Sequence, residues 1–362
     1  MLRSWMIPLT AAMFLVQGCG EPGDLDEIEQ WIADTKPLDL HQAELVKEGA
    51  QYSDPLSMLV FSTLPVIDLE FAVHDEETSC PRLIDASDRA AGIVDWRIES
   101  DCGWEDGDGQ HRMEGSIVAR GDTNGTELVY HGFRRTTVRA DLCNGQEAEM
   151  AMTGVISFPF AYLPFTPDDS EEVPPETAEP RMDHYDIHIH LETSGVDQES
   201  CVLEKSELAY DVTIDRRFEQ LDPAGDADLS DIQGRAAMLT QTRNPAQESW
   251  QTVSTGAWRV SADDYGSTAG DESCREYVTG TLRLEAGGDE AVLQPEAPAS
   301  CLSDEQDVCT AWSLNGKAQP EMCGFVGLLG CSAGPDAPPP WTAIIMLVGG
   351  LIWQSRRRRQ RA

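Results

Sequence analysis

Three histidines near the middle of the chain have a spacing that could support metal chemistry. His188 and His190 lie two residues apart in a segment where polar and apolar residues alternate, and His184 precedes them at the same parity. In a strand such residues project from one face, where two imidazoles and a carboxylate could hold zinc, which normally takes three or four protein ligands. The apolar residues between them occupy the other face, which leaves the histidines facing water. We therefore expect no metal site, and His184, His188 and His190 remain weak candidates.

Two segments partly match known functional motifs, a catalytic elbow and a calcium loop, and neither match is complete. Residues 330–334 fit the Gly-x-Ser-x-Gly elbow, which needs a strand before it and a helix after it, but a proline-rich spacer follows here. Residues 106–109, Asp-Gly-Asp-Gly, begin like a calcium loop, yet the twelfth position is Ile117 instead of the required Glu. The sequence therefore predicts no catalytic residue and no cofactor.

Cysteines are numerous, and an exported chain would oxidise them. Cys19 and Cys331 belong to the terminal segments, and no central pair forms the Cys-x-x-Cys of a zinc knuckle or redox site. The eight that remain are an even number, which predicts four disulfides, mostly between sequence neighbours. The predicted pairs are Cys80–Cys102, Cys143–Cys201, Cys274–Cys301 and Cys309–Cys323.

The N-terminus has the layout of a secretory signal. Arg3 provides a short basic region, residues 5–15 are an apolar core, and Val-Gln-Gly-Cys follows at 16–19. The last four residues resemble the lipobox of bacterial lipoproteins. The resemblance implies cleavage before Cys19 and attachment of lipid to Cys19.

The C-terminus consists of three blocks in a fixed order. A spacer rich in small residues and proline follows Cys331, an apolar run covers 341–353, and arginines cluster at 356–361. As a helix the apolar run would be about 20 Å long, short of the ~30 Å hydrocarbon core of a bilayer. Gly330-Cys331, the spacer, the short hydrophobic helix and the arginine run resemble the MYXO-CTERM sorting tail of myxobacterial surface proteins. The resemblance implies processing at Cys331, contact with export and sorting machinery, and a place in the cell envelope, at the outer membrane or cell surface.

The charge of the chain is strongly unbalanced. Lys and Arg number 26 against 64 for Asp and Glu, a net charge of −38. Such a surface repels phosphates, so the composition excludes nonspecific nucleic-acid binding and disfavours docking on anionic lipid through a basic face. Membrane attachment would instead use the lipid on Cys19, the C-terminal helix, or both. We interpret the acidity as a means of keeping a secreted surface soluble.

Most of the chain between these ends has the pattern of strands. Short alternating segments separated by Gly, Asp and Asn turns predict a mainly β fold, with antiparallel β-sandwich or barrel-like modules, one or two in number. Apolar residues at 58–61 and 66–71 are interpreted as strands, and acidic residues 219–231 as a loop. Short helices are expected near the N-terminus, at 24–33 and around 40–46, and a hydrophobic helix at the C-terminus.

These patterns divide the chain into segments. Five prolines and six acidic residues mark a linker in the middle. Similar Thr-Gly strands at 152–156 and 278–282 leave open a weak repeat of the two β regions. The predicted segments are a signal peptide (1–18), an acidic, partly helical spacer or closing helix (19–55), a first β module (56–163), a linker (164–182), a second β module (183–293), an irregular cysteine-rich segment (294–330) and the sorting tail (331–362).

The expected function is non-enzymatic. The chain is predicted to be a secreted, membrane-anchored structural or ligand-binding protein of the cell surface, with an unknown ligand. The alternative is a metal-dependent surface hydrolase that uses the strand bearing His184, His188 and His190. A cleft with convergent polar groups would distinguish the hydrolase.

Overall fold

Strands dominate the structure, a computed structural model that describes most of the chain between residues 23 and 323. The described ranges are 23–73, 80–99, 101–106, 109–138, 147–163, 181–196, 201–221, 225–244, 249–269, 276–294 and 309–323. The three helices in this part of the chain are α1 (Gly23–Asp34), α2 (Ala43–Tyr52) and α3 (Pro55–Val73). The strands are β1 (Arg82–Asp85), β2 (Val94–Glu99), β3 (Cys102–Asp106), β4 (Gly109–Asp122), β5 (Gly125–Val138), β6 (Glu147–Phe158), β7 (Arg181–Val196), β8 (Leu203–Leu221), β9 (Gly225–Arg243), β10 (Gln251–Ala269), β11 (Glu276–Ala286), β12 (Asp289–Gln294), β13 (Cys309–Leu314), β14 (Lys317–Ala318) and β15 (Met322–Cys323).

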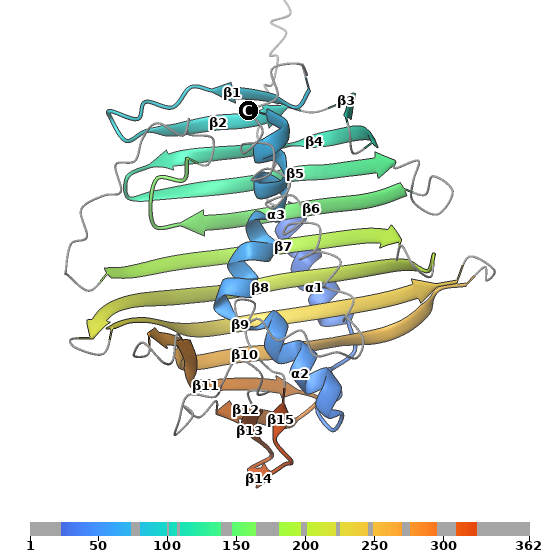
Figure 1. Ribbon diagram of the computed structural model, residues 1–362, viewed down its shortest axis with the longest axis vertical. Coiled ribbons are helices and arrows are strands. Elements are labelled where there is room, and N and C mark those ends of the chain that lie inside the picture. Colours follow the sequence, from blue (N-terminus) through green and yellow to red (C-terminus); the bar gives the residue numbers. More distant parts are fainter. Residues whose placement is uncertain are drawn as a thin grey trace, which may run out of the picture.

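The strands form one antiparallel sheet in near-sequential order. The path runs β1-β2-β4-β5-β6-β7-β8-β9-β10-β11-β12-β13-β14, while β3 pairs with β4 and β15 with β13 (Figure 1). The mainly β character is thus confirmed. The sandwich or barrel-like arrangement is wrong for the described strands, because helices, and not a second sheet, cover the apolar face.

The two predicted β regions join into this single sheet. β6 and β7 pair continuously from Glu149 opposite Ser194 to Ser157 opposite Asp186. Residues 56–163 and 183–293 therefore contribute strands to the same sheet, on either side of the β6–β7 seam.

Helices α2 and α3 cover one face of the sheet and run one after the other across many strands (Figure 1). Tyr130 on β5 donates its hydroxyl to the Ser62 carbonyl in α3 at 2.6 Å. Tyr210 on β8 donates to the Tyr52 carbonyl at the end of α2 at 2.7 Å. Both tyrosines are fully buried, so these hydrogen bonds satisfy their hydroxyls in the core.

The strands predicted at 58–61 and 66–71 are wrong, because both segments lie in α3. A continuous apolar run has no period that separates a buried helix from a buried strand. The local signals for a helix precede the run. Asp54 accepts hydrogen bonds from the Ser57 backbone N–H and hydroxyl, both at 2.9 Å, which makes Asp54 the N-cap, and Pro55 occupies the first helical position.

Helix α1 packs on the opposite face of the sheet. Its Ile28 and Ile32 are buried against Ala209 on β8 and Ala237 on β9. These alanines alternate along their strands with the residues that face α2 and α3, and they are register partners. Small side chains allow a helix to approach the sheet closely. In the segment expected as a spacer or closing helix, α1 therefore covers part of this face of the sheet.

Two further expectations are corrected. The acidic residues 219–231 do not form one long loop, since β8 and β9 pair out to Leu221 opposite Gly225. The segment 294–330 is not irregular throughout, because β13, β14 and β15 lie within it. The turn between β13 and β14 is Asn315-Gly316, a strong hairpin signal in which both residues adopt positive φ.

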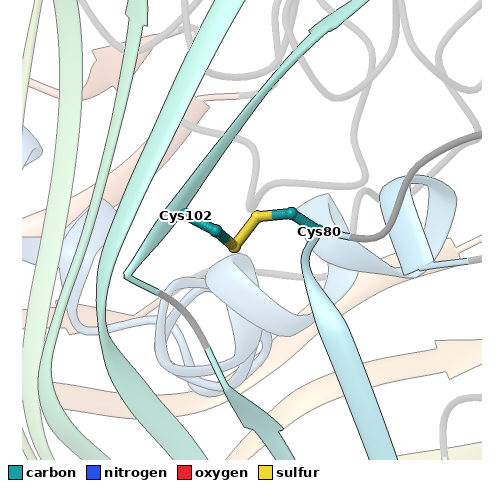
Figure 2. The surroundings of a disulfide bond; sticks show 2 residues. All are labelled: Cys80 and Cys102. Atoms are coloured by element: carbon teal, nitrogen blue, oxygen red, sulfur yellow. A yellow bond between two sulfur atoms is a disulfide. The ribbon is translucent and has the colours of Figure 1, made fainter.

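A disulfide ties the segment before β1 to the start of β3. Cys80 and Cys102 are bonded, as predicted, with a sequence separation of 22 (Figure 2). A closed loop of this length stabilises a fold by about 3 kcal/mol, mainly by restricting the unfolded chain.

Cys201 is also disulfide-bonded. Cys309 and Cys323 are register partners on β13 and β15, so that pairing stays a prediction with suitable backbone geometry. Cys143, Cys274 and Cys301 lie outside the described residues.

Candidate functional site

A cavity of about 540 Å³ lies between the start of α2 and the strands β13–β15. Its apolar lining includes Trp312 and Met322, both largely buried. The Trp312 indole donates to the Pro320 carbonyl at 2.8 Å, which fixes the orientation of the ring. Sites for small molecules are commonly concave, of this size, and lined by apolar groups with a few polar ones.

The rim of the cavity carries charges of both signs. His41 and Glu44 lie at the α2 side, and Lys317 and Glu321 lie on the strand side. The His41 imidazole, two residues before α2, lies 3.2 Å from the Asp289 carboxylate at the start of β12. The apolar Trp312 and Met322, together with charges of both signs, suit a small amphipathic molecule that carries both a cationic and an anionic group.

The histidines of β7 lie on the face of the sheet that α1 partly covers. The prediction that the histidines share one face of the strand is correct. The residues between them are buried on the other face: Tyr185, Ile187, Ile189 and Leu191. The side chains become less exposed toward α1, from 57% for His184 to 35% for His188 and 18% for His190. Trp31 of α1 covers His190, with the ring centroids 4.8 Å apart.

Each histidine has its own carboxylate on the neighbouring strand β8. His184 Nδ1 lies 2.7 Å from Asp215, and His188 Nδ1 lies 2.9 Å from Asp211. The third pair is looser, with His190 Nε2 at 3.7 Å from Glu207. Because the histidines of one strand are spread along its length, the three do not converge on one ion or one substrate.

The His184 imidazole should titrate above its ordinary pKa of 6.5. A hydrogen bond to Asp215, together with the negative charge of Asp186, raises its pKa. Charged His184 therefore stabilises the fold fully below pH 6.5, and this contribution is lost as the pH rises through the higher folded-state pKa. An NMR titration should find a pKa above 6.5 that falls in Asp215→Asn and is unaffected by Asp211→Asn, which removes the partner of His188. An unchanged pKa in Asp215→Asn would contradict the assignment.

The terminal signals fall outside the described residues. Cys19, Cys331 and the whole tail 331–362, with its expected hydrophobic helix, belong to this group. Among the helices of the described ranges, none has the length and apolar character that a membrane crossing requires.

Comparisons with protein-family models, curated proteins and solved structures found no match to this chain. Function is therefore inferred from the geometry of the site.

The sequence reasoning missed the cavity and the partners of the histidines. Asn315-Gly316 after an alternating apolar segment could have revealed the β13–β14 hairpin that carries Trp312. The approach of α2 to that hairpin is a contact across more than 250 residues, for which the sequence holds no local signal. The carboxylates opposite the histidines depend on the register of β7 and β8, which local patterns do not specify.

Proposed function

We propose that this protein is an exported, membrane-anchored, non-enzymatic binding protein of the cell surface. The observation that carries the proposal is the cavity between α2 and β13–β15, whose lining combines apolar side chains with charges of both signs. The ligand class that fits is a small amphipathic molecule with cationic and anionic groups. Membrane attachment would come from lipid on Cys19, from the C-terminal tail, or from both, through the cell's export and sorting machinery.

Two features support a place outside the cytoplasm. The bonded cysteines Cys80, Cys102 and Cys201 suit an oxidising compartment, because cytosolic thiols are kept reduced. The lipobox-like residues 16–19 would act as the export and lipidation signal, and the MYXO-CTERM-like tail would act as the sorting signal. A surface lipoprotein at the outer membrane or cell surface agrees with both.

Mass spectrometry of surface-extracted protein tests the location. We expect a mature chain that begins at lipidated Cys19 and ends near Cys331. Intact arginines 356–361 would contradict tail processing, and an unmodified Cys19 would contradict lipid attachment.

Native mass spectrometry of the same material tests binding. Wild-type protein should retain a small-molecule adduct, and Ala43→Trp, which fills the cavity from its α2 side, should lose it. Ala33→Trp is the matched control, since Ala33 is an exposed alanine at the end of α1, outside the cavity lining. Equal retention in the two variants, or no adduct on wild-type protein, would overturn the binding proposal.

A further inference from the structure

Three ligand-type side chains converge where β7 and β8 pass beside α1. His190 and Glu192 project from the same face of β7, and Glu207 on β8 is the register partner of Glu192. One potential ligand atom from each of the three lies within 4.8 Å of the others. This grouping differs from the three-histidine pattern of the sequence, because two of its three ligands are carboxylates.

His190 supplies the second observation. Its Nε2 is buried and has no hydrogen-bond partner among the described residues. A buried nitrogen without a partner is costly, so such an atom needs a specific explanation.

The distance from His190 to Glu207 suits an ion between them. Nε2 lies 3.7 Å from Glu207 Oε2, beyond hydrogen-bond range. Two ligands at about 2.1 Å from a tetrahedral ion are themselves about 3.4 Å apart. Only a small adjustment would bring both atoms to a shared cation.

The ammonium group of Lys205 now neutralises part of the charge of the two carboxylates. Lys205 Nζ lies 2.7 Å from Glu207 Oε1 and 3.6 Å from Glu192 Oε2. The Lys205 side chain is 32% exposed, so its flexible stem can move the ammonium into solvent.

We propose that His190 Nε2, Glu192 and Glu207 form a site for a divalent transition-metal ion of the zinc type, which displaces the Lys205 ammonium. An imidazole with two carboxylates selects such an ion over calcium or magnesium, which prefer all-oxygen ligands. Three protein ligands leave a fourth position for water. The ion would join β7 to β8 beneath Trp31 and so stabilise the attachment of α1. The site is independent of the cavity and of the function proposed for it.

Calorimetric titration of the mature, disulfide-intact protein with zinc chloride at pH 7 tests the site. We expect one ion per chain with a dissociation constant of roughly 1 μM, corresponding to about −8 kcal/mol. His190→Phe, which keeps a ring against Trp31, should weaken binding at least tenfold, corresponding to a loss of about 1.4 kcal/mol. Circular dichroism of this variant would verify that it is folded.

Two further variants make the outcome decisive. Lys205→Met removes the competing cation and should tighten binding about tenfold, a gain that a misfolded variant could not produce. His188→Ala is the matched control, because His188 occupies the same face of β7 but pairs with Asp211. Absence of zinc binding, equal loss in His188→Ala, or weaker binding in Lys205→Met would each overturn the proposal.

Discussion

Replacing Trp258 with alanine should lower the free energy of unfolding by about 4 kcal/mol. The indole is 3% exposed on β10, and its Nε1 donates to the Ser53 hydroxyl at 2.8 Å, at the junction of α2 and α3. The substitution leaves a void in the core, and it also deprives a fully buried hydroxyl of its donor. Urea unfolding of the disulfide-intact protein would measure the loss.

Two controls separate these contributions. Trp258→Phe keeps much of the ring volume and removes the hydrogen bond, so it should cost only about 1–2 kcal/mol. Val253→Ala on the same strand changes a side chain that is 61% exposed, and it should stay within about 0.5 kcal/mol of wild type. A Trp258→Ala protein as stable as Val253→Ala would show that Trp258 does not anchor the helices.

Gly154→Val should destabilise the protein by roughly 4 kcal/mol at the β6–β7 seam. Gly154 has φ +118°, and a Cβ there would lie 2.0 Å from the His188 carbonyl oxygen on β7. A β-branched residue would be strained at this φ, and it would also push the two backbones apart. Urea unfolding would measure the effect, and hydrogen exchange should locate the faster amides in β6 and β7.

Gly195→Val is the matched control for this change. Gly195 lies on β7 in the same sheet, and an added Cβ there would meet nothing within 4 Å. We expect an effect well under that of Gly154→Val. Equal effects would mean that the close approach of β6 and β7 does not depend on Gly154.

Local patterns predicted the strands well where one face is buried and the other is exposed. The Thr-Gly strands predicted at 152–156 and 278–282 lie within β6 and β11, and the alternation around His188 and His190 gave the correct faces of β7. The apolar run of α3 was misassigned because apolar residues lie on all sides of the helix, which leaves no helical period in the sequence. The cap formed by Asp54 and Pro55 was the stronger signal.

Global arrangement was harder to predict, for a physical reason. The prolines and charges of 164–180 are typical of a linker between domains, yet a hairpin connection between paired strands can have the same composition. Backbone hydrogen bonds between β6 and β7 join the sheet there. Such pairing does not require particular residue types, so the sequence of neither strand reveals it. The candidate sites depend in the same way on register and on the docking of α1 and α2.

The order of elements has a consequence for folding during synthesis. Each strand can pair with the preceding strand soon after both have left the ribosome. Contacts that are this local in sequence favour rapid folding. The helices emerge first, however, and Tyr210, the partner of Tyr52, follows 158 residues later. At 5–20 residues per second this delay is roughly 8–30 s. During that interval the buried side of α2, which includes Val46 and Ala50, has no sheet to cover it, so the nascent chain is most prone to aggregation before its middle strands appear.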